Sequence, residues 1–126
     1  MPPEREKKNI LIVEDNQEQA MALSMFLRGN GYTVRVAFDA TLGVMATHQS
    51  KIDLIILDLG LPGGGGFFML DNIKKNSVSF VIPVFVLTAK IESGLEQQAR
   101  AKGAVEFFTK PCDTAKLLEA IQAVIP

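Results

Sequence analysis

The sequence has no tryptophan, one tyrosine, one cysteine and almost no net charge. Its 13 basic and 14 acidic residues nearly cancel, so no broad electrostatic field attracts nucleic acid or an anionic membrane. The single Cys112 cannot form an internal disulfide, which suits a reducing compartment. No stretch approaches the roughly 20 apolar residues of a membrane span, and the apolar run behind the charged N-terminus is too short for a secretory signal. We therefore expect a cytoplasmic protein that binds neither nucleic acid nor membranes directly.

What the chain does contain is enough apolar sequence for one core. It has 126 residues, of which 48% are hydrophobic, and this falls within the usual size of a single domain. No repeat and no internal linker interrupts it. We expect residues 1–8 to form a flexible lead-in and residues 9–126 to form one globular domain.

Strand and helix patterns alternate along the chain. Short apolar runs predict strands at residues 10–13, 33–38, 52–57, 81–88 and 105–109. Apolar residues at helical spacing predict helices at residues 16–29, 40–49, 67–75, 92–102 and 113–125, with Asn16 and Asp113 as N-caps.

The apolar runs themselves indicate the fold class. An uninterrupted run such as residues 52–57 is typical of a strand that is covered on both faces, as in a parallel sheet between helix layers. Strands that alternate with helices form right-handed crossovers in a doubly wound α/β sandwich. We expect a flavodoxin-like five-stranded parallel sheet of order 2-1-3-4-5, with five helices on its two faces.

Four of the expected strands end in residues that suit phosphoryl chemistry. Glu14 and Asp15 follow the first strand, Asp58 the third, Thr88 ends the fourth, and Lys110 follows the fifth. The carboxyl ends of parallel strands meet at one edge of the sheet, where ligands bind in open α/β folds. The sequence therefore predicts three acids, a hydroxyl and an ammonium in one cleft.

These residue types can transfer a phosphoryl group. A carboxylate that attacks a phosphoryl donor needs a hard cation to neutralise its own charge and that of the phosphoryl oxygens. Mg²⁺ suits this role because it binds one or two carboxylates plus phosphate and keeps several waters, and Mn²⁺ is a possible substitute. We expect Asp58 to be the phosphoacceptor, and Glu14, Asp15, Asp58 and the backbone carbonyl of Gly60 to form the metal site.

In this order, the strand-end motifs resemble the receiver (response regulator) domain of two-component signalling. The resemblance spans residues 8–125 and rests on Glu14-Asp15, Asp58 with Leu61-Pro62, Thr88-Ala89 and Lys110-Pro111. It implies that residues 9–126 are a receiver domain that accepts a phosphoryl group on Asp58 from a histidine kinase or a histidine phosphotransfer protein. It further implies that Asp15 ligates the metal directly, that Glu14 acts through water, and that the Lys110-Pro111 bond is cis.

The resemblance also implies a switch. Phosphorylation adds about −1.5 to −2 charge units, so the Thr88 hydroxyl is drawn toward modified Asp58 and Phe107 rotates into the space that it leaves. Phe107 has no hydroxyl, so apolar burial alone would govern this rotation, and a static core phenylalanine is the alternative. The output face would be the fourth helix, fifth strand and fifth helix, acting on a downstream effector protein or an output domain.

The chain departs from the family pattern in two places. Four glycines at 63–66 stand where the family usually has an acidic residue and one glycine, which predicts a mobile loop and a poorly defined start of the third helix. Gly60 offers no side chain to orient a hydrolytic water, and Lys90 could screen the phosphoryl group. We therefore expect a long-lived phosphorylated state.

Three alternatives remain. A pseudo-receiver would dock partners without being phosphorylated. A haloacid-dehalogenase-like phosphatase would need a second carboxylate where this chain has Gly60. A flavin or nucleotide binder is poorly served by a chain with Tyr32 and no tryptophan for ring stacking. We expect a phosphoacceptor that catalyses its own phosphorylation and dephosphorylation rather than a conventional turnover enzyme.

Overall fold

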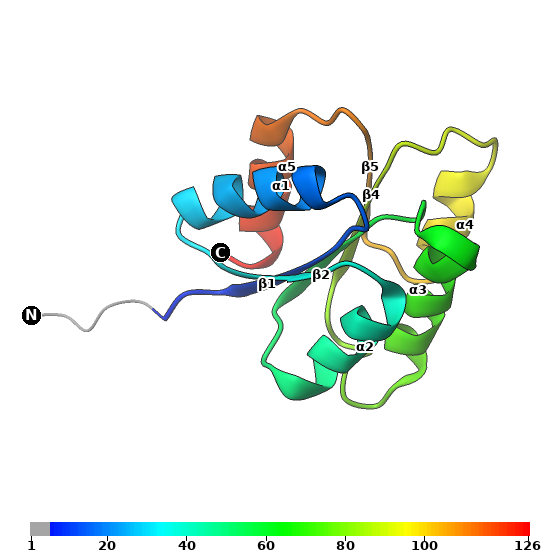
Figure 1. The fold of residues 1–126 in the computed structure, drawn as a ribbon, viewed down its shortest axis with the longest axis horizontal. Coiled ribbons are helices and arrows are strands. Elements are labelled where there is room, and N and C mark those ends of the chain that lie inside the picture. Colours follow the sequence, from blue (N-terminus) through cyan, green and yellow to red (C-terminus); the bar gives the residue numbers. More distant parts are fainter. Residues whose placement is uncertain (1–5) are drawn as a thin grey trace, which may run out of the picture.

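A computed structural model describes residues 6–126, and its fold is shown in Figure 1. Five parallel strands form one sheet in the order β2-β1-β3-β4-β5, as predicted. The strands are β1 (Asn9–Val13), β2 (Thr33–Ala37), β3 (Leu54–Leu57), β4 (Val84–Thr88) and β5 (Glu106–Thr109). The helices are α1 (Gln17–Gly29), α2 (Ala40–Gln49), α3 (Gly65–Lys75), α4 (Leu95–Ala101) and α5 (Thr114–Val124), with a 3₁₀ turn η1 (Pro62–Gly64) before α3. Most of the expected lead-in, residues 1–5, lies outside the described residues.

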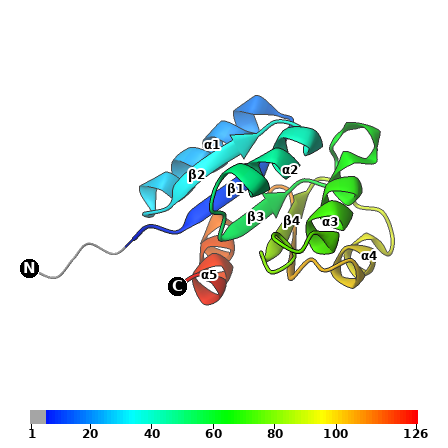
Figure 2. The same cartoon turned by 90° about the horizontal axis from the view of Figure 1, so that it is seen from below.

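The sheet lies between two layers of helices. Helices α1 and α5 cover one face, and α2, α3 and α4 cover the other (Figures 1 and 2). Alternate residues of β1 supply the two cores: Ile10 and Ile12 pack in the cluster with α1 and α5, whereas Leu11 and Val13 pack in the cluster with α2 and α3. Both faces of the strand are therefore buried, which is why its sequence is apolar at consecutive positions.

The predicted N-caps begin α1 and α5. The Asn16 side chain accepts a hydrogen bond from the Gln19 backbone N–H at 2.9 Å, and the Asp113 side chain accepts one from the Ala115 backbone N–H at 2.9 Å. These bonds satisfy backbone donors that the first turn of a helix leaves free. Both caps lie a few residues after the end of a strand, so α1 and α5 begin close to the C-terminal edge of the sheet.

Two elements begin three residues later than their sequence patterns predicted. The strand expected from residue 81 begins at Val84, because Pro83 has no N–H to donate to a neighbouring strand. The helix expected from residue 92 begins at Leu95, after Gly94 with φ of +79°. A positive φ interrupts helical geometry, so residues 92 and 93 belong to the β4–α4 loop.

The glycine run starts α3 earlier than predicted. The 3₁₀ turn η1 passes directly into α3 at Gly65, two residues before the expected start at Phe67. Gly63 and Gly64 have φ of +66° and +72°, a conformation that glycine adopts without steric cost. As the sequence predicted, no side chain caps this helix.

Gly66 has a separate reason to be glycine. A Cβ atom at this position would lie 2.5 Å from the Leu59 Cα and 2.8 Å from the Asp58 carbonyl oxygen. These distances are too short for any side chain, so α3 can approach the loop after β3 only because residue 66 is glycine. The first turn of α3 therefore packs against the backbone that carries Asp58.

Within residues 6–126, none of the helices has both the length and the apolar character that crossing a membrane requires.

Candidate functional site

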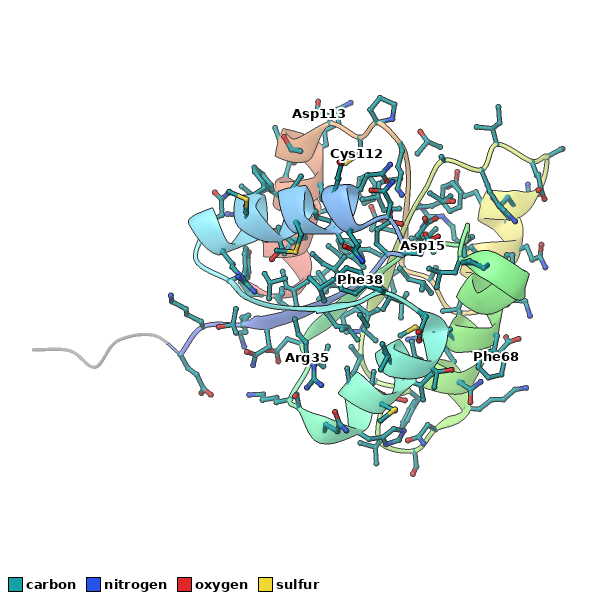
Figure 3. All side chains as sticks on the ribbon, viewed as in Figure 1. Asp15, Arg35, Phe38, Phe68, Cys112 and Asp113 are labelled. Carbon is teal, nitrogen blue, oxygen red and sulfur yellow. The ribbon has the colours of Figure 1, made fainter. Side chains whose placement is uncertain are left out.

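The ends of β1 and β3 bring three carboxylates together. Glu14 and Asp15 follow β1 and Asp58 follows β3, and the register pairs Val13 with Leu57 just before them. The Asp58 N–H donates to the Val13 carbonyl at 3.1 Å, which continues the strand pairing to the phosphoacceptor candidate. One carboxylate oxygen from each acid lies within 4.8 Å of the other two. Figure 3 labels Asp15 at the end of β1, beside the start of α1.

The Lys110 ammonium lies among these acids. It donates to a Glu14 carboxylate oxygen, to Asp58 Oδ2 at 3.2 Å and to Gln19 Oε1 at 2.7 Å. The backbone N–H of Lys110 donates to the Thr88 carbonyl at 2.9 Å, which anchors this residue to the end of β4. The Lys110-Pro111 peptide bond is cis, as predicted.

Burial and charge act against each other within the cluster. Burial raises the pKa of Glu14, while hydrogen bonds from Lys110 and from the Asn16 backbone offset part of this effect and the Asp58 charge adds to it. Burial alone would lower the pKa of Lys110, but its hydrogen bond to Glu14 and the charges of Asp58 and Glu14 outweigh it and raise that pKa. Lys110 is therefore a cation at neutral pH.

The donor atoms and the charge balance fit a hard divalent cation. Three carboxylates against one ammonium leave two negative charges uncompensated when all are ionised, which is the charge of one such ion. The set contains oxygen ligands only, and Mg²⁺ prefers these. Asp15 is exposed while Glu14 and Asp58 are buried, so an ion held by the three would remain accessible to water and to a phosphoryl group.

Gly60 lies directly against the Asp58 carboxylate. Its backbone N–H donates to Asp58 Oδ1 at 2.8 Å, while Lys110 contacts Oδ2. Both oxygens of Asp58 are thus oriented by a donor. A Cβ atom at position 60 would lie 3.1 Å from Oδ1, so the nature of residue 60 directly affects the surroundings of this carboxylate. The expected metal contact from the Gly60 carbonyl stays a prediction.

Thr88 and Phe107 lie on the neighbouring strands β4 and β5. Thr88 is fully buried at the end of β4, and its hydroxyl oxygen accepts a hydrogen bond from the Lys90 backbone N–H at 3.2 Å. Phe107 is half-buried on β5, where it packs against the cluster that includes Val86 and Leu95. It also lines a cavity of about 670 Å³ under the β4–α4 loop. Rotation of Phe107 stays a prediction, but space exists beside the ring.

A second cavity, of about 590 Å³, runs from the acids along α1 toward the start of α5. Glu14, Gln19, Asp58 and Lys110 line it together with apolar side chains such as Phe26. The half-buried thiol of Cys112 also lines it, and Figure 3 labels this residue and Asp113 at the start of α5. Burial and then the Asp113 charge raise the pKa of the Cys112 thiol, which disfavours a reactive thiolate.

Sequence reasoning missed Gln19 and Gly66. Gln19 lies in the first turn of α1, and an exposed glutamine at such a position carries no sequence signal of function. The available signal was its position four residues after Asp15, which places it at the same end of the sheet as the acids. Gly66 belongs to a run of four glycines, and nothing in that run distinguishes a glycine required for packing from one required for a turn.

The strand order, the acids after β1 and β3, the buried threonine ending β4 and the lysine after β5 define a doubly wound signalling domain of the receiver class. The chain belongs to the response regulator receiver domain family, whose model matches residues 10–122. Receiver domains of this family function with histidine kinases and output domains in two-component systems.

Similar proteins differ in length. The chain is 32% identical over 116 residues to the protein PilH of Pseudomonas aeruginosa, covering 92% of this chain and 96% of PilH. It is 33% identical over 118 residues to the phosphate regulon transcriptional regulatory protein PhoB of Escherichia coli, covering 94% of this chain and 52% of PhoB. The chain therefore spans nearly all of one relative and about half of the other.

Solved structures share the fold. The chemotaxis protein CheY4 of Vibrio cholerae matches with a TM-score of 0.87 at 26% identity, covering 94% of this chain and 99% of that chain. The receiver domain of a sensor histidine kinase from Pseudomonas aeruginosa matches with a TM-score of 0.85 at 27% identity, covering 95% of this chain and 98% of that chain. The latter structure has a magnesium ion coordinated in its active site cleft.

Proposed function

We propose that residues 9–126 act in the cytoplasm as a receiver domain that accepts a phosphoryl group on Asp58 from a histidine kinase or phosphotransfer protein. Mg²⁺, or Mn²⁺ in its place, would be held by Glu14, Asp15, Asp58 and the Gly60 backbone carbonyl. The main support is that the three carboxylates have ligand oxygens within 4.8 Å of one another beside a single lysine. The magnesium ion in the cleft of a related receiver domain also supports it.

In the proposed reaction, an Asp58 oxygen bonds to phosphorus as the phosphorus–nitrogen bond of the donor imidazole breaks, and the leaving imidazole takes up a proton. Glu14, Asp15 and Asp58 would hold the metal, whose positive charge would offset the negative charge of the carboxylates and of the phosphoryl oxygens. The Lys110 ammonium exchanges its contact with Asp58 for one with a phosphoryl oxygen. The Thr88 hydroxyl donates to another phosphoryl oxygen.

The proposed switch follows from Thr88. Its hydroxyl now accepts a hydrogen bond from the Lys90 backbone N–H, so a move toward Asp58 would shift the β4–α4 loop as well. Phe107 lines the cavity under the same loop and could fill space that Thr88 leaves. The face formed by α4, β5 and α5 would then change its shape for a downstream effector protein or an output domain.

The proposal is tested by titrating the protein with Mg²⁺ alone and then with Mg²⁺ and beryllofluoride, using calorimetry and NMR. Wild type should bind both. Asp15→Asn should weaken Mg²⁺ binding by at least about tenfold, or about 1.4 kcal/mol, because it removes a charged ligand. Glu119→Gln, which removes an exposed acid of α5, should not change Mg²⁺ binding. A wild type that binds Mg²⁺ but no beryllofluoride would instead identify a pseudo-receiver.

A further inference from the structure

The Lys110 ammonium has as many acceptors around it as it has donors. A lysine ammonium carries three N–H groups. The acceptors are the Glu14 carboxylate, Asp58 Oδ2 at 3.2 Å and Gln19 Oε1 at 2.7 Å. Two of these acceptors belong to the acidic cluster already described. The third, Gln19, comes from α1 and has no part in the proposed metal site.

The backbone of Gln19 is fixed where its side chain begins. Its N–H donates at 2.9 Å to the side chain of Asn16, the N-cap of α1. The next residue, Ala20, is fully buried against the sheet, which sets the rotation of α1 about its axis. The Gln19 amide therefore reaches Lys110 from an anchored turn, although the two residues are 91 positions apart in the chain.

The chemistry of an amide suits this position. A carboxylate at residue 19 would add a fourth acid to the cluster and compete with the phosphoryl group for Lys110. An apolar side chain would leave one ammonium donor to solvent and let the flexible lysine side chain sample other rotamers. An uncharged carbonyl oxygen accepts the hydrogen bond without changing the charge of the site.

We propose that Gln19 is a positioning residue for Lys110, holding its ammonium at the Asp58 carboxylate before a phosphoryl group arrives. This inference rests on the proposed function of Lys110 as a phosphoryl-oxygen partner. On phosphorylation, the Lys110 contact with Asp58 is exchanged for one with a phosphoryl oxygen, while the Gln19 contact is kept. Gln19 and Lys110 also both line the 590 Å³ cavity along α1.

Two substitutions at residue 19 and one in the same turn test the inference. Gln19→Met keeps the length of the side chain but removes the hydrogen-bond acceptor. Gln19→Glu keeps an acceptor at the same position. Gln17→Met is the matched control, since Gln17 is exposed in the same turn of α1. Because Gln19 is also exposed, these variants should fold, and thermal unfolding checks this; Gln19→Leu serves as a second acceptor-free variant.

The first measurement is the NMR signal of the Lys110 Nζ in metal-free protein. Wild type, Gln17→Met and Gln19→Glu should give a signal with slowed hydrogen exchange, and Gln19→Met should lose it. The second measurement is phosphorylation by phosphoramidate at saturating Mg²⁺, which requires no protein partner. Gln19→Met should react about five- to tenfold more slowly than wild type, with its Mg²⁺ affinity unchanged.

The outcomes separate this inference from the proposed function. If phosphoramidate does not modify wild type, the proposed function of the site fails. If wild type is modified and Gln19→Met matches it in rate, positioning by Gln19 is overturned, whatever happens to the Lys110 signal. An equal loss of rate in Gln17→Met would also overturn it, because the effect would then belong to the helix and not to the amide.

Discussion

The backbone N–H of Lys110 donates to the backbone carbonyl of Thr88 at 2.9 Å, one residue beyond the pairing of Thr88 with Thr109. The backbone positions that carry the proposed hydroxyl and ammonium partners of the phosphoryl group are thus held together by the same pairing that forms the sheet. Substitution of either side chain should therefore alter the site while leaving the fold intact.

Lys110→Met should change two affinities in opposite directions. Removing the ammonium relieves its repulsion of a bound cation and frees the Asp58 carboxylate, so Mg²⁺ affinity should rise by about three- to tenfold. The same change removes a partner of the phosphoryl oxygens, so beryllofluoride binding at saturating Mg²⁺ should weaken by at least about tenfold. Calorimetry measures both affinities.

The control for this pair of effects is Lys51→Met. Lys51 is an exposed lysine that precedes β3, at the opposite edge of the sheet from the acids. Lys51→Met changes the net charge of the protein by the same amount as Lys110→Met, but residue 51 lies far from the acidic cluster. Both the Mg²⁺ affinity and the beryllofluoride affinity should therefore stay within about twofold of wild type. A parallel loss of both affinities in Lys110→Met would contradict the assigned role.

Thr88→Val should uncouple modification from the switch. Valine keeps the branched shape but has neither a hydroxyl for the phosphoryl group nor an acceptor for the Lys90 N–H. Beryllofluoride should still bind at Asp58, while the shift of the Phe107 ring signals that it causes in wild type should fall by more than half. NMR of the aromatic ring measures this shift, and exposed Thr33→Val serves as the control. If the Phe107 ring signals of Thr88→Val shift as much as those of wild type, Thr88 has no role in the switch.

Gly60 should make the phosphorylated state long-lived. Gly60→Asn would add an amide that can orient water beside Asp58. The phosphoryl group on Asp58 should then be hydrolysed several times faster than in wild type. Gly60→Ala separates this effect from bulk, because its Cβ also lies 3.1 Å from Asp58 Oδ1 but cannot orient water. Decay is followed after removal of the phosphodonor. A wild-type half-life of only seconds would count against this account.

Gly66→Ala should destabilise the domain by more than about 2 kcal/mol, because the new Cβ would overlap the Leu59 Cα and the Asp58 carbonyl oxygen. Gly29→Ala, in α1, adds the same methyl group where no atom beyond the adjacent residues and the helix's own backbone lies within 4 Å, so its stability should stay within about 1 kcal/mol of wild type. Urea unfolding of both variants measures the difference. If the two variants have equal free energies of unfolding, the backbone after Asp58 can shift to accommodate a side chain at residue 66, and the prediction is wrong.

The sequence predicted the sheet because its signals were local. Each of the strands β1, β3 and β4 contains a run of four buried apolar residues, and residues such as Glu14 and Asp58 mark where β1 and β3 end. Once the strands are known to be parallel, their ends must meet at one edge of the sheet. The grouping of Glu14, Asp15, Asp58 and Lys110 follows from this rule.

The roles of Gln19 and Gly66 were missed because they depend on contacts that the folded structure creates. Gln19 contacts Lys110 because α1 begins at the edge of the sheet where β5 ends, and no local sequence pattern reveals that contact. The need for glycine at Gly66 comes from the Leu59 backbone, which folds against it. The predicted start of α4 was wrong for a local reason. Gly94 adopts a positive φ, which a glycine permits but does not require, so the sequence alone did not reveal it.

The most direct test of the central claim is the mass of the protein after incubation with Mg²⁺ and acetyl phosphate, with wild type compared to Asp58→Asn. Wild type should gain the mass of one phosphoryl group, sensitive to hydroxylamine as expected for an acyl phosphate, and Asp58→Asn should gain none. Equal phosphorylation of both proteins, or modification that maps to another residue, would contradict the assignment of Asp58 as the phosphoacceptor.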